Sequence, residues 1–278
     1  MMKVTIVVVF YKQDIKQSKT FSSLEKVLLE RKAILKNIDI ILYDNSPEKQ
    51  DFDVSQYSGQ IDYIHDPRNL GIATAYNYAW QRAEENGSEW LLLFDHDTKV
   101  TEEYIDQMLK NHDVKEEIVA VVPKIVTNGI MVSPVYSHSL RPLQTERPVE
   151  GVQEKPVMAI NSGSLLKVSF LNEIGGFNKE FPLDYLDHWL FHEIYDRDKK
   201  IRLLRVTLEH DLSVMDYSGV SLNRYKSILD AEMKYYSKYK TELSGEYRKQ
   251  LVKRLAKQLL VVKNKRIALY TLSRLLQK

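Results

Sequence analysis

Short apolar runs alternate along the first 210 residues with segments in which apolar side chains recur every three or four positions. The runs, rich in Val, Ile and Leu, predict buried strands at residues 4–10, 38–43, 61–64, 90–94, 118–122 and 201–208. The helical spacing predicts helices at 21–35, 73–85, 102–109, 169–174 and 187–195, and after residue 225 the pattern is helical to the end. Strands that alternate with helices imply right-handed βαβ units. The sequence therefore predicts an α/β fold with a mostly parallel central sheet.

Residues 128–156 interrupt this alternation. The segment has no apolar periodicity and contains several prolines, among them Pro134, Pro142 and Pro148. Such a stretch is either a linker between domains or, inside a compact domain, a binding loop or lid. Both interpretations stay open at the level of sequence.

Composition narrows the class of protein. The 278 residues are 44% hydrophobic and 28% charged, and none is cysteine. The absence of cysteine excludes a disulfide scaffold, a thiolate zinc site and a cysteine nucleophile, and it fits a reducing cytoplasm. No stretch approaches the roughly 18 consecutive apolar residues that a membrane-spanning helix needs.

Charge is distributed unevenly. The last 32 residues, 247–278, carry ten Lys or Arg and no Asp or Glu, whereas the first 246 carry 30 basic and 38 acidic side chains, a net of −8. We therefore expect a catalytic or binding domain over residues 1–225 and a helical, basic C-terminal extension over residues 226–278.

The basic extension has an apolar stripe at helical spacing, made of Leu251, Leu255, Leu259 and Val262, and a basic face made of Lys249, Lys253 and Lys257. This composition is typical of a helix that lies in the plane of an anionic membrane surface. The alternatives are a helix that packs on the acidic body and a homodimer seam. Nucleic-acid binding is disfavoured, because only two aromatic residues interrupt the basic positions.

Polar clusters follow three of the predicted strands. They are Asp44, the segment Asp66-Pro67-Arg68-Asn69, and the segment Asp95-His96-Asp97. Each alone is explained as a turn residue or helix cap, but ligands of parallel sheets bind at the carboxyl ends of strands, where all three converge. Two carboxylates at positions i and i+2 offer oxygens to a hard cation, Mg²⁺ or Mn²⁺, that also grips phosphate.

Two further candidates lie downstream. Asp187 stands at the start of a predicted helix, where it is either an N-terminal cap or a general base that removes a proton from an acceptor hydroxyl. His210 follows an apolar strand and is either a packed surface histidine or a further metal ligand. No glycine-rich dinucleotide or P-loop motif and no Gly-x-Ser-x-Gly elbow is present, which argues against those enzyme classes.

An ordered set of motifs resembles the family 2 glycosyltransferases, most closely their rhamnosyltransferase-like branch, over about residues 3–215. The motifs are Val7-Val8-Val9-Phe10-Tyr11, Tyr43-Asp44-Asn45-Ser46, Asn69-Leu70-Gly71-Ile72-Ala73, Phe94-Asp95-His96-Asp97-Thr98, Asn161-Ser162-Gly163, Gly175-Gly176-Phe177 and Asp184-Tyr185-Leu186-Asp187. The resemblance implies a GT-A fold, a Rossmann-like nucleotide-diphospho-sugar transferase.

The implied reaction is the inverting transfer of one sugar from a nucleoside-diphosphate donor, dTDP-rhamnose or a UDP-hexose, to a saccharide acceptor. The acceptor of this branch is linked to polyprenyl diphosphate in bacterial surface-polysaccharide synthesis, so the resemblance implies a cytoplasmic enzyme, peripheral at the inner face of the cell membrane. The Gln-x-x-Arg-Trp motif of processive synthases is missing, which argues for a non-processive enzyme.

The resemblance also implies roles for individual residues. The donor side would comprise Phe10, Tyr11, Asp44, Arg68, Asn69, Gly71 and Asp95, with Asp44 at the pyrimidine base, Arg68 near the base and diphosphate, and Asp95 by the ribose. The metal ligands would be Asp97 and His210, holding Mn²⁺ or Mg²⁺. Asp187 would be the catalytic base, with Asp184, His188 and Trp189 on the acceptor side.

The chain departs from the family at two of these positions. Phe10 stands where the family usually has Thr or Ser, and His188 stands where it often has an acidic residue.

Two other functions compete with transfer. Residues 92–98 also resemble the first motif of haloacid-dehalogenase-type phosphatases, but that motif normally lies on the first strand, and here three strands precede it. A catalytically inactive nucleotide-binding or scaffold module is the other alternative, against which the presence of Asp95, Asp97, Asp187 and His210 argues.

Overall fold

The fold is built on one twisted sheet in a computed structural model that describes residues 2–29, 36–57, 60–110, 115–140, 143, 146–211 and 220–277. The strands on its main path are β1 (Val4–Phe10), β2 (Ile38–Asp44), β3 (Ile61–His65), β4 (Trp90–Asp95), β5 (Thr98–Lys99), β6 (Ile118–Thr127), β11 (Ser164–Lys167) and β12 (Lys200–His210). Their order is β3-β2-β1-β4-β11-β6-β12-β5. The pairs among β3, β2, β1 and β4 are parallel, as is β6 with β12, whereas β11 runs antiparallel to both its neighbours.

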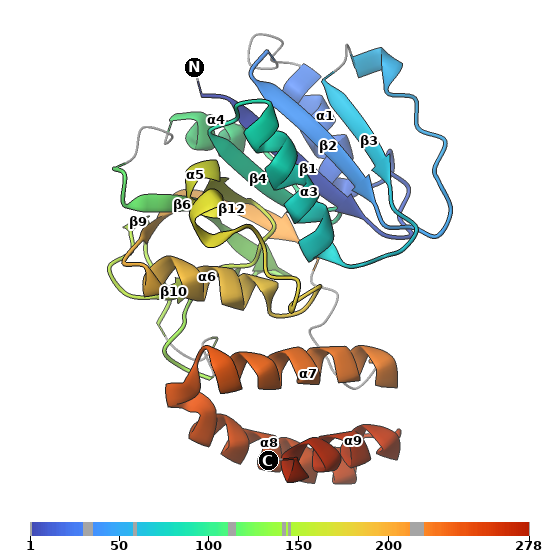
Figure 1. Cartoon of the computed structure of the whole chain (residues 1–278), viewed down its shortest axis with the longest axis vertical. Helices are drawn as coiled ribbons and strands as arrows, with labels where there is room; N and C mark the ends of the chain where they lie inside the picture. Colours follow the sequence, from blue (N-terminus) through green and yellow to red (C-terminus); the bar gives the residue numbers. More distant parts are fainter. Residues whose placement is uncertain are drawn as a thin grey trace.

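Helices cover both faces of the sheet (Figure 1). The helices α1 (Lys19–Leu29) and α4 (Glu102–Lys110) pack on one face, and α3 (Ile72–Glu85), α5 (Val168–Ile174) and α6 (Leu186–Asp196) pack on the other. An apolar core lies on each face of the sheet, and alternate residues of β1 pack into the two cores. Ile6 and Val8 lie in one, and Val7 and Val9 lie in the other. A strand that is apolar on both faces is buried on both, which explains the continuous apolar runs of the sequence.

Three C-terminal helices form a further layer beside α6 (Figure 1). They are α7 (Leu222–Lys238), α8 (Ser244–Val261) and α9 (Lys265–Leu276), with a short 3-10 helix, Thr241–Leu243, between the first two. They share an apolar core that includes Tyr225, Leu251 and Ile267, and the carboxylate of Glu232 pairs with Arg254 through two hydrogen bonds of 2.6 and 2.8 Å. Among the described helices, none combines the length and the apolar character needed to cross a bilayer.

The predicted α/β class with a mostly parallel sheet is confirmed. The helix predicted over 21–35 is present as α1 up to Leu29, and residues 30–35 lie outside the described part of the chain. Strand β11 was not predicted, because its four residues Ser-Leu-Leu-Lys are too few to show a period.

The segment 128–156 contains short strands rather than a bare loop. β7 (Ile130–Ser133) pairs with β6, and β9 (Gly151–Val152) pairs with β12. Between them, β8 (Val135–Tyr136) forms a small antiparallel ladder with β10 (Val157–Met158). The segment therefore extends the central sheet through β7 and β9 and adds a separate two-stranded ladder. The expected division after residue 225 stays a prediction.

Candidate active site

The register of the parallel strands brings the polar clusters to one edge of the sheet. Across β1, Phe10 lies opposite Asp44 of β2, and Val9 lies opposite Asp95 of β4. At the far side, Thr98 of β5 pairs with His210, the last residue of β12. The turn after β4 therefore lies beside the end of β12, although more than 100 residues separate them in the chain.

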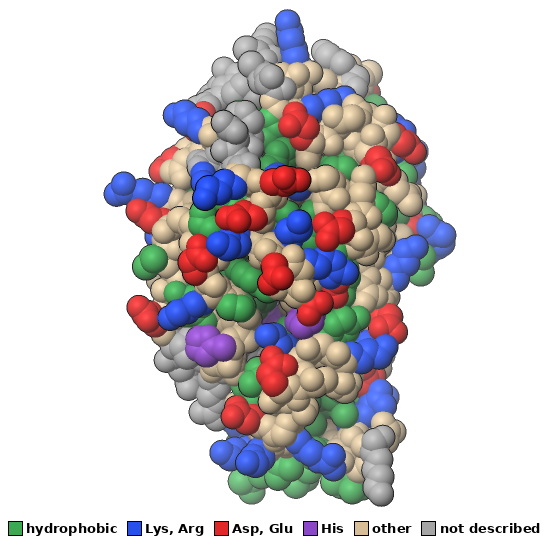
Figure 2. Space-filling view, turned by 60° about the vertical axis from the view of Figure 1, so that its left-hand side comes forward, with side chains coloured by type: hydrophobic (Ala, Val, Ile, Leu, Met, Phe, Trp, Pro, Cys, Tyr) green, Lys and Arg blue, Asp and Glu red, His purple; other side chains and the backbone are tan. Residues whose placement is uncertain are grey.

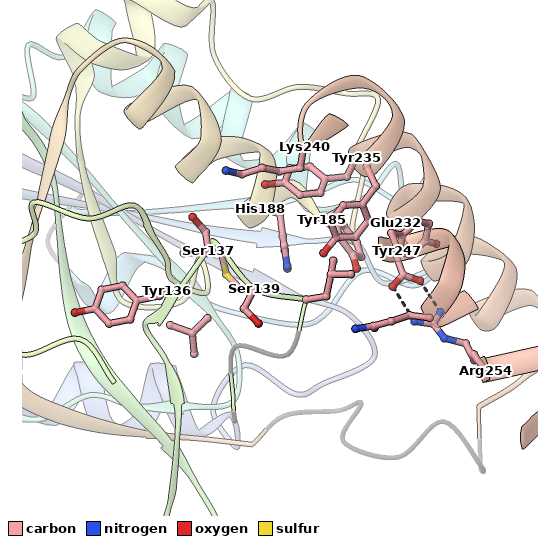
Figure 3. A pocket seen from close by; sticks show the side chains of 15 residues that line it. Tyr136, Ser137, Ser139, Tyr185, His188, Glu232, Tyr235, Lys240, Tyr247 and Arg254 are labelled. Atoms are coloured by element: carbon pink, nitrogen blue, oxygen red, sulfur yellow. Dashed lines mark hydrogen bonds and ion pairs between the residues drawn. The ribbon is translucent and has the colours of Figure 1, made fainter. Parts of the chain in front are cut away.

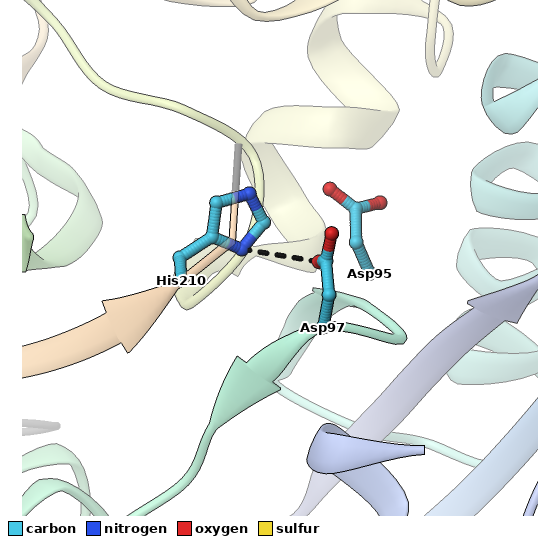
Figure 4. Close-up of side chains that lie close together, drawn as sticks. All are labelled: Asp95, Asp97 and His210. Carbon is cyan, nitrogen blue, oxygen red and sulfur yellow. Dashed lines mark ion pairs between the residues drawn. The ribbon is translucent and has the colours of Figure 1, made fainter. Parts of the chain in front are cut away.

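Asp95, Asp97 and His210 form a cluster at this edge (Figure 4). Each offers one oxygen or nitrogen atom, and these atoms all lie within 4.8 Å of one another. The Nδ1 atom of His210 is 3.2 Å from Oδ1 of Asp97. Among the described residues, this is a set of two carboxylates and one imidazole that suits a divalent cation such as Mg²⁺ or Mn²⁺.

A network of hydroxyl groups holds the cluster in place through hydrogen bonds. The Ser162 hydroxyl accepts a hydrogen bond from the backbone N–H of Asp95 at 3.0 Å and shares one of 2.6 Å with the Thr98 hydroxyl. The Thr98 hydroxyl in turn lies 2.8 Å from Nδ1 of His210. Thr20, in α1, accepts from the backbone N–H of Thr98 at 2.9 Å. Three distant segments thus orient the Asp95–Thr98 turn.

The electrostatics of the cluster favour a bound cation. Burial, and after it repulsion from Asp97, raises the pKa of Asp95, and burial likewise raises the pKa of Asp97. Burial lowers the pKa of His210, which keeps its imidazole neutral and able to bind metal. Oδ1 of Asp97 is buried and makes no hydrogen bond to the described residues. Two ionised carboxylates and a neutral imidazole would carry two negative charges, which one divalent cation balances, so these residues fit a divalent metal.

Asp44, at the end of β2, is fully buried. Its Oδ1 accepts from the backbone N–H of Ser46 at 2.9 Å, and its Oδ2 accepts from the Gln50 side chain at 3.0 Å and from the Tyr63 hydroxyl at 2.8 Å. Burial raises the pKa of Tyr63 to about 12, so the phenol stays a donor. An ionised carboxylate offers about four acceptor positions, which leaves one for a ligand.

Asp66, after β3, holds Arg68 through two hydrogen bonds, of 2.7 Å from Nε and 2.8 Å from Nη2. The Tyr43 hydroxyl donates to the same carboxylate at 2.8 Å. These hydrogen bonds hold the pKa of Asp66 well below its usual value, and those from Arg68 have the largest effect. The Arg68 side chain is 67% exposed, so Asp66 fixes the orientation of its guanidinium group while solvent and ligands can still reach it.

The other predicted donor residues have different surroundings. The Phe10 side chain is fully buried in the core beneath the sheet, and its carbonyl oxygen accepts from the N–H of Asn45 at 2.8 Å, whereas Tyr11 is 43% exposed. Asn69 has a φ of 48° and Gly71 a φ of 90°. A Cβ atom on Gly71 would lie 2.2 Å from the carbonyl oxygen of Pro182, so this glycine allows α3 to approach the 181–187 segment.

That segment presents Asp187 in the first turn of α6. Oδ1 of Asp187 accepts from both the backbone N–H of His188, at 2.8 Å, and its Nδ1, at 2.9 Å. The other predicted acceptor-side residues point elsewhere: Asp184 is bound by Arg224 and Ser227 of α7, and Trp189 is buried in the core.

Tyr76 of α3 lies beside the candidate metal cluster. Its hydroxyl is 3.4 Å from Oδ1 of Asp95. Burial is the largest cause that raises the pKa of Tyr76, and the charges of Asp95, Asp187 and Asp97 raise it further. Asp95, in the candidate cation cluster, and Asp187, the candidate base, both act electrostatically on this buried phenol.

The sequence itself matches a known family over this region. The profile described as Glycosyl transferase family 2 covers residues 5–175, more than half of the chain. The chain belongs to glycosyl transferase family 2. The predicted resemblance to that family is confirmed, whereas its rhamnosyltransferase-like branch stays a prediction. A comparison with curated proteins finds no match.

Solved structures of GT-A glycosyltransferases share the fold of this family 2 member. Residues 1–349 of S. aureus TarS in complex with UDP-GlcNAc are 13% identical, with a TM-score of 0.57 over 99% of this chain and 80% of that one. The mannosyltransferase PcManGT from Pyrobaculum calidifontis, in complex with GDP-Man and Mn²⁺, is 14% identical, with a TM-score of 0.52 over 99% and 87%. At such identities the likeness establishes the GT-A fold, as predicted.

Sequence reasoning missed several residues of this family 2 site. The motifs contain Ser162 and Thr98, but the sequence predicts no role for them, and it predicts none for Tyr76. The available signal for Ser162 and Thr98 was a small hydroxyl residue beside each strand end, whereas Tyr76 is one of 17 tyrosines and nothing in the chain distinguishes it.

Proposed function

We propose that the protein transfers one sugar, with inversion, from a nucleoside-diphosphate donor to a hydroxyl group of a saccharide acceptor. The observation that carries the proposal is the cluster of Asp95, Asp97 and His210, with the separate carboxylate of Asp187 in the first turn of α6. Inverting transfer needs a group that stabilises the leaving diphosphate and, across from it, a base for the attacking hydroxyl. Carboxylates at two separate positions meet both needs.

Asp97 and His210 would hold the divalent cation, with Asp95 beside it. When bound, the cation neutralises charge that develops on the diphosphate as the sugar carbon leaves it. Asp187 takes the proton of the acceptor hydroxyl, whose oxygen forms the new bond to that carbon from the opposite face. His188 donates to Oδ1 of Asp187 and so orients the carboxylate, leaving Oδ2 for the proton.

The nucleotide of the donor would carry a pyrimidine base. Asp44 has three intramolecular donors and is fully buried, so the N3–H group of uracil or thymine would bind its remaining acceptor position after the side chain of Gln50 or Tyr63 moves aside. Arg68, held by Asp66, offers its cation near the base and diphosphate. This chemistry supports UDP-hexoses and dTDP-rhamnose as donors and does not choose between them. Tyr11, Asn69 and Gly71 would complete this side, with the Phe10 contribution limited to its backbone.

The C-terminal helices would bring the enzyme to a polyprenyl-diphosphate-linked acceptor at the inner face of the cell membrane. Large apolar side chains are exposed on α8 and α9, namely Val252, Leu259, Leu260, Val261, Leu269, Leu272 and Leu276. Lys and Arg side chains border apolar ones at this end of the molecule (Figure 2). Of the stripe predicted from sequence, Leu251 is buried against α7 and Val262 packs on the same core, whereas Leu259 belongs to the exposed apolar face. A homodimer through this face is the competing outcome.

Nucleotide release tests the proposal. The purified chain is incubated with a panel of UDP- and dTDP-sugars, Mn²⁺ or Mg²⁺, and a saccharide acceptor, and nucleoside diphosphate is quantified. We expect release with one donor class, and loss of release in Asp97→Asn. Hydrolysis of an aryl phosphate without nucleotide release would instead support the phosphatase alternative. Binding of the nucleotide without turnover would support the inactive module.

A further inference from the structure

A pocket opens on the side of His188 that faces the C-terminal helices (Figure 3). Its volume is about 140 Å³. A second cavity of about 200 Å³ shares Ser137, His188 and Tyr235 with it. Each is larger than the space that a single water needs. The pocket has walls from three parts of the chain: the segment 135–140, the start of α6, and helices α7 and α8.

Aromatic rings form one wall of the pocket. The ring of Tyr185 lies 4.3 Å from that of His188, and the ring of Tyr235 lies 5.5 Å from it, centroid to centroid. Tyr236 stacks on Tyr247 at 4.5 Å, which joins α7 to α8. Such rings offer flat apolar faces edged by hydroxyl groups, which match a sugar ring with its apolar C–H face and its polar rim.

Polar groups lie among these rings. The pair Glu232–Arg254, the ammonium of Lys240 and the hydroxyl groups of Ser137 and Ser139 line the pocket. The Tyr247 hydroxyl is buried and has no hydrogen-bond partner within the described part of the chain. Glu232 and Arg254 satisfy each other, Lys240 pairs with Glu242, and the Ser137 hydroxyl donates to the carbonyl of Pro156, so these groups form a polar rim and already have partners.

His188 connects the pocket to the chemistry. Its Nδ1 atom lies 2.9 Å from Oδ1 of Asp187, while the same imidazole lines the pocket. The charge of Asp187 reaches both Tyr235, in the pocket wall, and Tyr76, beside the metal cluster. The imidazole of His188, which lines the pocket and contacts the carboxylate of Asp187, is therefore the link between the pocket and the candidate base.

We propose that this pocket is the acceptor subsite, that it takes a pyranose ring, and that α7 and α8 complete the active site. The inference rests on the proposed transferase function, and it adds a role for the C-terminal extension besides attachment to a membrane. Six of the fifteen residues that line the pocket, Tyr235, Tyr236, Tyr247 and Arg254 among them, come from these helices.

Saturation-transfer NMR with methyl pyranosides tests the pocket without relying on turnover. The probes are methyl glycosides of glucose, galactose, mannose, N-acetylglucosamine and rhamnose, added to the full chain with Mg²⁺. Ser139→Trp fills the pocket, and Tyr236→Leu removes one ring from its wall. Ser273→Trp, on the exposed side of α9 and outside the pocket, is the matched control for added bulk. Thermal unfolding of each variant establishes that it is folded.

We expect at least one pyranoside to receive saturation from the wild type and from Ser273→Trp, and none from Ser139→Trp. In the transfer assay, Tyr236→Leu should raise the KM for the acceptor about tenfold, equivalent to about 1.4 kcal/mol, without changing the KM for the donor. Equal saturation in Ser139→Trp and wild type would overturn the assignment, as would a chain that binds a nucleotide-sugar in calorimetry but none of the pyranosides. Failure to bind any nucleotide-sugar would instead contradict the proposed function.

Discussion

The imidazole of His188 and the carboxylate of Asp187 are joined twice, because both the backbone N–H and Nδ1 of His188 lie within 2.9 Å of the same oxygen. Adjacent residues in the first turn of a helix rarely restrain each other in this way, since side chains at i and i+1 diverge. Here the ring of Tyr185 packs against the imidazole at 4.3 Å and keeps it turned back. One carboxylate oxygen is thereby held, and the other is left for the proposed role as base.

Replacing Asp187 by Asn should remove this base while keeping its shape. We expect turnover to fall by about 10²–10⁴-fold, the usual contribution of a general base, with donor affinity nearly unchanged. Asp198→Asn is the matched control, because Asp198 is exposed and its φ of 53° suits Asn equally well. Steady-state kinetics and calorimetry measure the two effects. Near-normal turnover in Asp187→Asn would assign the base to another residue.

A divalent cation should stabilise the fold through Asp95, Asp97 and His210. Without it, two buried carboxylates repel each other, so binding that favours the folded state raises the melting temperature. At a concentration about 100 times the dissociation constant the gain is about 2.7 kcal/mol, or roughly 5–10 °C for a chain of this size. Differential scanning fluorimetry with and without Mn²⁺ measures the shift.

The same assay contains its own control for the cation site. Asp97→Asn removes one of the two like charges, so the variant without metal should unfold no earlier than the wild type. It should also lose most of the shift caused by Mn²⁺. A full shift in Asp97→Asn or in His210→Ala would place the cation elsewhere.

The ends of the strands were predictable because they depend on local pattern. A continuous apolar run followed by Asp, as at Phe94-Asp95, indicates a buried parallel strand and its polar edge without knowledge of the partner strands. The pairing of Asp97 with His210 depends on β5 and β12, and β5 is only two residues long, so no period marks it. The position of His210 after an apolar strand made it a candidate, with a packed surface histidine as the alternative, and the family motif then favoured the metal ligand.

The pocket beside His188, in contrast, could not be predicted from the sequence. Tyr235 and Tyr236 belong to a helix whose apolar positions predict only that one face is buried. Whether that face meets a core or surrounds a cavity depends on how the segment 135–140 packs against it. This information is tertiary, and a single sequence does not contain it in local form.

Acid should remove a defined part of the stability through Asp66. Its pKa is lowered mainly by the hydrogen bond from Arg68, so the native state keeps the carboxylate charged at a pH where the unfolded chain protonates it. The contribution is complete above the usual pKa near 3.8 and is lost as the pH falls below that value. At pH 7, Asp66→Asn should lower the free energy of unfolding by about 1 kcal/mol. Urea titrations between pH 7 and pH 3 should show this difference shrinking, and a constant difference would exclude the mechanism.

The exposed apolar end of α8 should bind anionic membranes. Leu260 is 84% exposed and Val261 66% exposed, and the neighbouring Lys257, Lys263 and Lys265 have no acidic residue beside them in the sequence. Each basic side chain near an anionic leaflet contributes about 1 kcal/mol, screened by salt. We therefore expect sedimentation with phosphatidylglycerol-containing vesicles at low salt, weakened by raised salt and by Leu260→Glu. Ile130→Glu, at a residue of β7 that is 56% exposed, is the control and should bind as the wild type does.

The same variants separate the membrane from a second copy of the chain. An apolar face that closes a homodimer would give a molar mass near twice 32.5 kDa in light scattering, reduced to the monomer value by Leu260→Glu, with no dependence on vesicles. A face that docks on lipid leaves the mass near 32.5 kDa in both proteins and changes only their sedimentation with vesicles. Vesicle binding that Leu260→Glu leaves unaltered would show that the tip of α8 is not the contact. Because Leu251 and Tyr247 are buried against α7, point substitution at Leu260 is the sharper test: deleting residues 247–278 would also expose the core of the helical layer.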